Sequence, residues 1–193
     1  MKIAILALQG AFIEHEKILN QLNVETIQLR KKDDLKEQFD GLILPGGEST
    51  VQGKLLLELD MFDDLRIKIA EGLPVMATCA GLILLAQELS NDTRCYLQTL
   101  PVKVKRNAYG RQLGSFYVED DIRPIGKFPM KFIRAPYIES VSEDVEVLAK
   151  VEGHIVAVRY KQQIGMAFHP ELTGDTRVHE WFIQRVGQSK IYY

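Results

Sequence analysis

The chain has 193 residues, a length that suits one domain with a well-formed hydrophobic core. Hydrophobic residues make up 46% of it and charged residues 26%, as in soluble globular proteins. The formal net charge of -2, from 24 basic and 26 acidic residues, gives no reason to expect binding to nucleic acid or to an acidic membrane. No apolar run reaches the length of a membrane span, and the first residues lack the design of a cleavable signal peptide.

The two cysteines, Cys79 and Cys95, do not have the spacing of a metal site, and a chain of this size needs no disulfide to be stable. We therefore predict a protein of the reducing cytoplasm, with no metal and no other cofactor. Cys95 follows a polar stretch, residues 91–94, with no base nearby in the sequence. We expect it to be incidental to function.

The first half of the chain alternates apolar runs typical of buried strands with helical stretches. Strands are predicted over residues 3–8, 24–29 and 41–44, and from Pro74 up to Cys79. Helices are predicted over residues 12–22 and in the stretch that holds Phe62, Leu65 and Ile69 at helical spacing. Such alternation is typical of a parallel sheet covered by helices on both faces.

From about Val102 the pattern changes to shorter and more polar strands. These strands are predicted over residues 145–151, 154–158 and 164–168, joined by hairpin turns at Glu152-Gly153 and Gln162-Gln163. A closing helix is predicted to begin at Asp175, a favourable N-cap, and to face Val178, Trp181, Phe182 and Val186 inward. The chain shows no repeat and no linker, so the sequence predicts one three-layer α/β domain over residues 1–193, with a mostly parallel central sheet.

The strongest candidate for chemistry is Cys79, which ends an apolar run and is followed at once by Ala80, Gly81 and a helical stretch. This pattern is typical of a nucleophile elbow, a strained turn from strand to helix that exposes its central side chain. Small neighbours are needed there, and Ala77, Ala80 and Gly81 supply them. The start of the helix would stabilise a thiolate. A cysteine alone is more often a buried small hydrophobe, so the prediction depends on its context.

A base for this thiol is predicted at the end of another apolar run, in Phe168-His169-Pro170-Glu171. In an extended chain, residues two apart place their side chains on one face. His169 and Glu171 therefore have the spacing of a base and the carboxylate that orients it. Cysteine, elbow and His-x-Glu together favour nucleophilic catalysis over a structural cysteine.

Residues 44–50, Leu-Pro-Gly-Gly-Glu-Ser-Thr, are predicted to join a strand to a helix at the carboxyl edge of the sheet, where ligands bind in open α/β folds. The loop has no Gly-Lys-Ser/Thr and is not a phosphate loop. It could be an ordinary turn capped by Ser49 or Thr50. Beside a cysteine elbow, it could instead supply an oxyanion-hole N–H near Gly47, with the Ala80 N–H as the second donor.

Two arginines, Arg106 and Arg134, each end an apolar run. They could be solvated surface charges, or they could hold a substrate carboxylate with two donors. Of the remaining histidines, His15 is expected to pack or to serve the start of a helix, whereas His154 and His179 are expected at the surface. This leaves His169 as the candidate base.

The cysteine elbow, the Gly-Gly loop and His-Pro-Glu together resemble the class I, or triad, glutamine amidotransferases. The wider pattern is similar to one family among them, the glutaminase subunits of pyridoxal 5′-phosphate synthases. The similar blocks lie at residues 8–11, 14–15, 44–50, 78–83, 106–107 with 110–112, 132–136 and 168–173. They span the chain nearly end to end. One departure is Ala77, where many relatives have glycine, but alanine is small enough for the turn.

The resemblance implies a flavodoxin-like class I amidotransferase architecture. It also implies hydrolysis of L-glutamine to glutamate and ammonia, which passes to a (β/α)8 barrel synthase partner that builds the pyridoxal ring. Carried over by position, Cys79 is the nucleophile, His169 the base and Glu171 its orienter. The residues that would hold glutamine are Gly47, Glu48, Ser49, Arg106, Ile133 and Arg134. Gln9 would lie near the partner interface.

Three alternatives stay open at this point. One is the glutaminase subunit of another amidotransferase, such as imidazole glycerol phosphate synthase, although the blocks around Arg106 and at 132–136 count against it. The second is a peptidase or γ-glutamyl hydrolase of the same fold. The third is a regulatory module with a redox-sensing Cys79, a function that needs neither His169 nor Glu171.

Overall fold

The computed structural model describes residues 1–108 and 114–189. One predicted block, residues 110–112, lies outside them. The helices are α1 (Phe12–Gln21), α2 (Ser49–Glu58), α3 (Phe62–Ala70), α4 (Ala80–Leu85) and α5 (Arg177–Ser189), with short 3-10 turns η1 (Lys32–Lys36) and η2 (Pro170–Leu172). The strands are β1 (Lys2–Leu6), β2 (Glu25–Leu29), β3 (Gly41–Leu44), β4 (Val75–Thr78), β5 (Ala86–Leu89), β6 (Leu100–Lys105), β7 (Ser115–Ile122), β8 (Gly126–Ile133), β9 (Tyr137–Val141), β10 (Glu146–Val151), β11 (His154–Tyr160) and β12 (Gln163–Met166).

The main sheet has a parallel half and a mixed half. In the parallel half the strands follow the order β2-β1-β3-β4-β12, and each neighbouring pair is parallel. This is the strand order of flavodoxin-like doubly wound sheets. Beyond β12 the sheet continues through β11, β9, β6 and β5, and the first three of these pairings are antiparallel. The predicted hairpins at both ends of β11 are present, although the second turn lies one residue earlier than expected, at Lys161-Gln162.

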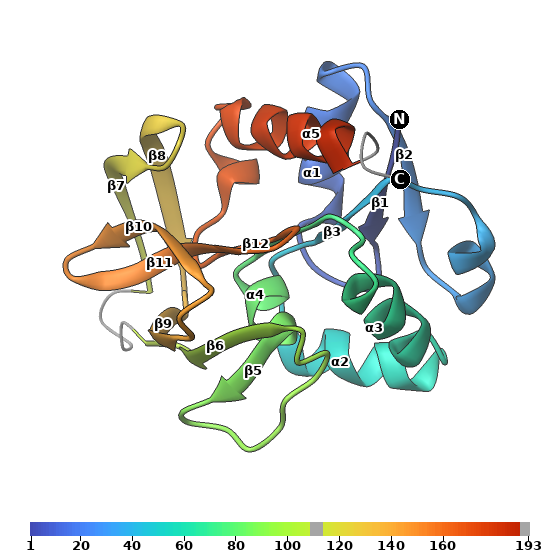
Figure 1. Cartoon of the computed structure of the whole chain (residues 1–193), viewed down its shortest axis with the longest axis horizontal. Helices are drawn as coiled ribbons and strands as arrows, with labels where there is room; N and C mark the ends of the chain where they lie inside the picture. Colours follow the sequence, from blue (N-terminus) through green and yellow to red (C-terminus); the bar gives the residue numbers. More distant parts are fainter. Residues whose placement is uncertain (109–113, 190–193) are drawn as a thin grey trace.

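Helices cover both faces of the parallel half, as predicted. Figure 1 shows α1 and α5 above the sheet and α2, α3 and α4 below it. β3 and β4 are buried along their whole length because both faces are covered. The inner stripe of α5, Val178, Phe182 and Val186, is completely or almost completely buried. The three-layer α/β architecture predicted from the alternation is confirmed.

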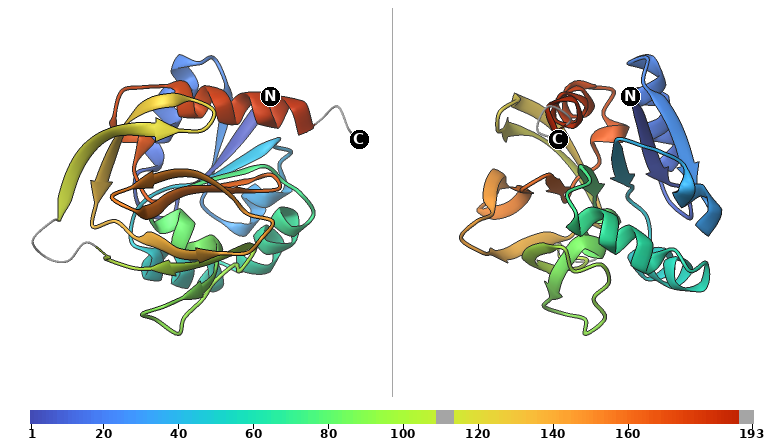
Figure 2. Two further views of the ribbon diagram at one scale, coloured as in Figure 1. Left: turned by 60° about the vertical axis from the view of Figure 1, so that its left-hand side comes forward. Right: turned by 45° about the vertical axis from the view of Figure 1, so that its right-hand side comes forward.

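The prediction of short strands after Val102 was wrong for β7 and β8. These are the two eight-residue strands of the chain's described part, and they form a separate antiparallel hairpin. Its register pairs Ser115 with Ile133 at one end and Ile122 with Gly126 at the other. Figures 1 and 2 show this hairpin at the end of the molecule opposite β2, beside β10. Its inner face buries Phe128, Met130 and Phe132. The hairpin matters for the site because it leads into Ile133 and Arg134.

Candidate active site

The carboxyl ends of the parallel strands carry the predicted site residues to one edge of the sheet. Gln9 follows β1, Gly47 follows β3, Cys79 follows β4 directly and His169 follows β12. These residues meet at a small cavity of about 160 Å³. The described residues that line it are Gln9, Gly47, Glu48, Ser49, Cys79, Ile83, Arg106, Asn107, Ile133, Arg134 and His169. All six residues that we predicted to hold glutamine are among them. Ile83 and Asn107 were not singled out in the sequence.

Cys79 has the strained backbone of an elbow. Its φ of 46° lies in the left-handed region, which a residue other than glycine adopts at a cost. The neighbouring strand holds this conformation, since the Cys79 N–H donates to the Met166 carbonyl oxygen at 2.8 Å. α4 begins at the next residue and packs so closely that a Cβ on Gly81 would overlap the backbone of Leu44. The elbow therefore exists, although α4 is only six residues long.

His169 and Glu171 form a direct pair. Nδ1 of His169 lies 2.7 Å from Oε1 of Glu171, and both side chains are buried. We expected an extended segment, but Pro170 begins a 3-10 turn, and it is this turn that brings the two side chains together. Burial disfavours the imidazolium, but hydrogen bonds to Cys79 and Glu171 outweigh it and raise the pKa of His169 to about 10. At neutral pH the ring is thus charged and ready to donate a proton.

The Gly46-Gly47 loop lies directly against the His169 ring. A Cβ on Gly46 would overlap that ring, and the Gly46 carbonyl oxygen accepts the Ala11 N–H at 2.9 Å. Position 46 therefore has no room for a side chain, which explains the glycine. The alternative of a turn capped by Ser49 or Thr50 is not what the structure shows, because neither side chain caps α2.

The structure gives Gln9 a role inside the site. Its side-chain oxygen accepts the Glu48 N–H at 2.7 Å, and its backbone oxygen accepts Nε2 of Gln52 at 2.9 Å. A Cβ on Gly47 would overlap the Gln9 amide oxygen. Gln9 thus fixes the loop that carries the predicted oxyanion donor. Its predicted place near a partner interface stays a prediction.

The two arginines differ in how their charge is balanced. Nη1 of Arg106 lies 2.6 Å from Asp92, and Nη2 lies 3.2 Å from Oε1 of Glu48. Hydrogen bonds from Arg94 and Arg106 hold the pKa of Asp92 well below its usual range. Sequence reasoning missed Asp92, which lies in a loop and carries no motif. Within residues 1–108 and 114–189, the exposed guanidinium of Arg134 forms no ion pair, and the φ of this residue is 44°.

The prediction that His179 lies at the surface was wrong. It is 0% exposed on α5, and its Nε2 lies 2.9 Å from Nδ1 of His15, which is also 0% exposed. His15 was expected to pack, and it does so next to Glu171. His154 is half-buried and stacks on Tyr137 with ring centroids 4.2 Å apart.

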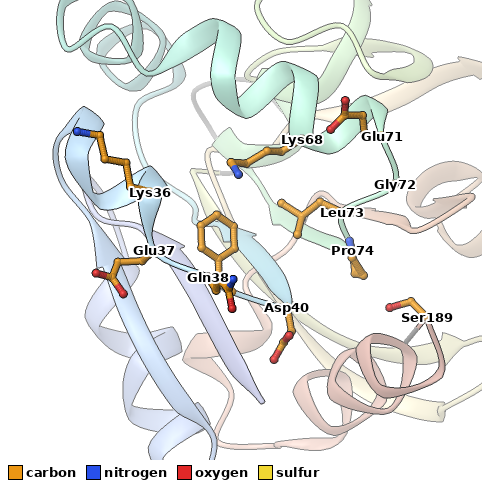
Figure 3. A pocket seen from close by; sticks show the side chains of 11 residues that line it. Lys36, Glu37, Gln38, Asp40, Lys68, Glu71, Gly72, Leu73, Pro74 and Ser189 are labelled. Atoms are coloured by element: carbon orange, nitrogen blue, oxygen red, sulfur yellow. The ribbon is translucent and has the colours of Figure 1, made fainter. Parts of the chain in front are cut away.

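A second hollow lies near the amino ends of β3 and β4, away from Cys79 (Figure 3). Asp40 and Pro74, which directly precede these strands, line it together with Ser189 at the end of α5. Its described lining residues include neither cysteine nor histidine. These residues therefore offer no thiol, and no imidazole to activate the Ser189 hydroxyl, so we expect the chemistry at the carboxyl edge. The described helices include none that is both long and apolar enough to cross a membrane.

Fold and site together define a class, the glutamine amidotransferases. A crystal structure described as that of a glutamine amidotransferase superposes on this chain with a TM-score of 0.91 and 42% identity, covering 96% of this chain and 98% of that one. The family model of the SNO glutamine amidotransferases matches residues 5–188. The chain belongs to the SNO glutamine amidotransferase family.

Named relatives of high identity match this chain over nearly its full length. A protein of Desulfitobacterium hafniense (strain DSM 10664 / DCB-2), pyridoxal 5′-phosphate synthase subunit PdxT, is 65% identical over 192 residues, which cover 100% of this chain and 96% of that protein. A protein of the same name from Streptococcus pneumoniae (strain CGSP14) is 54% identical over 187 residues, 95% of this chain and 96% of that protein. The resemblance read from the sequence blocks is confirmed.

Proposed function

We propose that this chain is the glutaminase subunit of a pyridoxal 5′-phosphate synthase, which hydrolyses L-glutamine to L-glutamate and ammonia. The observation that carries the chemistry is the contact of the buried Glu171 with His169, which itself lines the cavity that holds Cys79. The names of the full-length relatives support the assignment to vitamin B6 biosynthesis. A redox-sensing module, the non-enzymatic alternative, would leave the His169–Glu171 pair without a purpose.

The reaction follows from the proposed roles of the three residues. The thiolate of Cys79 attacks the side-chain amide carbon of glutamine and forms a C–S bond, while the electron pair of the C=O bond moves onto oxygen. Backbone N–H groups of Gly47 and Ala80 stabilise this oxyanion. His169 donates a proton to the nitrogen as the C–N bond breaks, which releases ammonia and leaves a thioester. His169 then takes a proton from water, and the resulting hydroxide attacks the thioester to give glutamate and the free thiol. No cofactor is required.

The charged residues of the cavity suit the amino-acid end of glutamine. The guanidinium of Arg134 has no ion pair with any described residue and can pair with the α-carboxylate, while Arg106 already shares its charge with Asp92 and Glu48. Glu48, whose side chain is 45% exposed, has a second carboxylate oxygen available for the α-ammonium. Gly47, Ser49 and the backbone of Ile133 complete the proposed binding site.

Replacing either arginine by lysine tests this part of the proposal. We expect Arg134→Lys to raise KM roughly tenfold or more with little change in kcat, because a point charge cannot reproduce the planar two-donor fork that binds ground and transition states alike. Arg106→Lys should have a similar but smaller effect, because Asp92 and Glu48 still anchor a cation there. Steady-state glutaminase kinetics of both variants measure the two changes in KM and kcat. Unchanged KM in both variants would show that the arginines are structural.

The proposed partner is the synthase subunit, a (β/α)8 barrel that receives the ammonia. A glutaminase that worked without its acceptor would waste glutamine, so coupling is expected. The Gly46-Gly47 loop is the proposed switch. Glycine permits a peptide bond to reorient, which would aim or withdraw an oxyanion-hole N–H, and Gln9 holds this loop through the Glu48 N–H. We place the complex in the cytoplasm, consistent with the two free cysteines. One domain over residues 1–193 is part of the same proposal, supported by a core that runs from Ile3 to Val186.

The partner proposal is tested by measuring glutamine hydrolysis with and without the synthase subunit. We expect this chain to have low activity alone and the synthase subunit to raise its kcat roughly 10²–10³-fold. That factor is the loss in kcat that usually follows removal of one oxyanion-hole donor. Gln9→Ala should weaken this activation, because the loop loses its acceptor for the Glu48 N–H. Equal rates with and without the subunit would remove the switch, and failure to associate would remove the pyridoxal assignment.

A further inference from the structure

The carboxylate of Glu171 has one oxygen in use and one that lacks a hydrogen bond. Oε1 lies 2.7 Å from Nδ1 of His169, whereas Oε2 is buried and has no hydrogen-bond partner within the described residues. The side chain is 0% exposed, so bulk water does not reach it. A buried carboxylate oxygen left unsatisfied is costly, and a carboxylate held at one oxygen alone is free to rotate. Something else must fix this side chain if it is to orient His169.

A ring nitrogen of His15, on α1, lies close to that oxygen. Nε2 of His15 lies 3.5 Å from Oε2 of Glu171 and 3.3 Å from Oγ1 of Thr78, the residue before Cys79. The ring is completely buried. His15 thus contacts both the carboxylate of Glu171 and Thr78, the last residue before the elbow.

A second histidine holds the other side of the His15 ring. Nε2 of His179 lies 2.9 Å from Nδ1 of His15, and the ring centroids are 5.1 Å apart. The Glu171 carboxylate favours one tautomer of His15. An unprotonated Nε2 would direct its lone pair at a negative oxygen, which is repulsive, whereas a protonated Nε2 would be attracted to it. In the arrangement proposed below, His15 carries its proton on Nε2 and its Nδ1 accepts the Nε2–H of His179. The Nδ1 of His179 is buried and has no hydrogen-bond partner among residues 1–108 and 114–189. In this arrangement it carries no proton, so it is an unpaired acceptor and not an unpaired donor.

Both rings are kept neutral. Burial lowers the pKa of His15 well below its usual value, and the nearby His179 and His169 lower it further. Burial alone lowers the pKa of His179 to about 4. A neutral donor to Oε2 would leave the charge of Glu171 uncancelled, so the carboxylate would keep its full attraction for the imidazolium of His169. A charged His15 would compete for that attraction.

We propose that His15, oriented by His179, is a positioning residue for the reaction: it donates from Nε2 to the second oxygen of Glu171 and so holds His169 toward Cys79. The inference rests on the proposed roles of these three residues. The proposal extends the site to a chain of five residues: His179 on α5, His15 on α1, Glu171 on η2, His169 and Cys79. Only the last three were given catalytic roles from the sequence.

Two amide substitutions of different length give the sharpest test, made on the complex with the synthase subunit. The amide nitrogen of His15→Gln can take the place of Nε2, whereas His15→Asn is too short and can reach only toward His179. We expect His15→Asn to lower kcat roughly 10–100-fold with KM unchanged, as for a misplaced catalytic group. His15→Gln should stay within a few-fold of wild type. Ile18→Ala, buried on the same helix, controls for a loss of stability alone, and its kcat should be unchanged in folded protein.

A double-mutant cycle shows whether His15 acts through Glu171. In a Glu171→Gln background, adding His15→Asn should have much less effect on kcat than it has alone, because the two changes break one chain. Equal effects in both backgrounds, or wild-type kcat in His15→Asn, would overturn the proposal. Should His15→Asn not fold, His179→Phe removes only the support of His15. A lowered kcat then supports the proposal and a wild-type kcat overturns it. An inactive wild-type complex would instead refute the proposed function.

Discussion

Replacing Cys79 by alanine is expected to abolish glutamine hydrolysis and to leave the fold intact. Loss of the nucleophile removes the covalent route, and the fall in kcat should be on the order of 10⁶-fold, as in other hydrolases that lose theirs. The structural cost is small, because the change removes one sulfur atom and the left-handed backbone at this position is no harder for alanine than for cysteine. Glutamate release measures the activity, and circular dichroism with thermal unfolding measures the fold.

Cys95→Ala is the matched control for this variant. Cys95 is also a free cysteine and is partly buried, but it does not line the Cys79 cavity. We expect this variant to retain the kcat of the wild-type complex. Activity that survives in Cys79→Ala but is lost in Cys95→Ala would move the nucleophile to the other cysteine.

Replacing His169 by asparagine is expected to cost more than replacing Glu171 by glutamine. General acid–base groups are typically worth about 10²–10⁴ in rate, and without the imidazole both proton transfers lose their carrier. The Glu171→Gln side chain can still accept a hydrogen bond from Nδ1 of His169 but cannot balance the charge of the ring, so its kcat should fall less. Steady-state kinetics of both variants in the complex give the order.

The opposite order of the two variants, or near-normal turnover by His169→Asn, would contradict the assigned roles. The pKa of His169 gives a second check. The hydrogen bond and the negative charge of Glu171 help to raise it to about 10, so Glu171→Gln should lower the pKa of the ring. Titration of the imidazole by NMR would show this shift, with Glu14→Gln as a control for the loss of one acidic residue.

The predictable part of the site was the part encoded by local patterns. An elbow depends on a strand, a small-residue turn and a helix within a few residues of Cys79, and the His169–Glu171 pair depends on a spacing of two. The β8 strand also had a local signal, the alternation of Phe128, Met130 and Phe132, which could have been recognised as a half-buried strand.

The unpredicted part depends on contacts between distant segments. His179 follows the apolar residue Val178 on α5, and nothing in the surrounding sequence indicates that its partner is His15 on another helix. Asp92 binds Arg106 from a loop without a motif. Such pairs become visible only when the fold brings α1, α5 and the loops to one edge of the sheet.

The central claim, that Cys79 attacks glutamine in this cavity, is tested most directly by labelling the complex with an alkylating analogue of glutamine and mapping the modified peptide. The claim predicts label on Cys79, none on Cys95, and slower labelling in the presence of glutamine. Label on Cys95 with Cys79 unmodified, or labelling of Cys79 that glutamine does not slow, would contradict it.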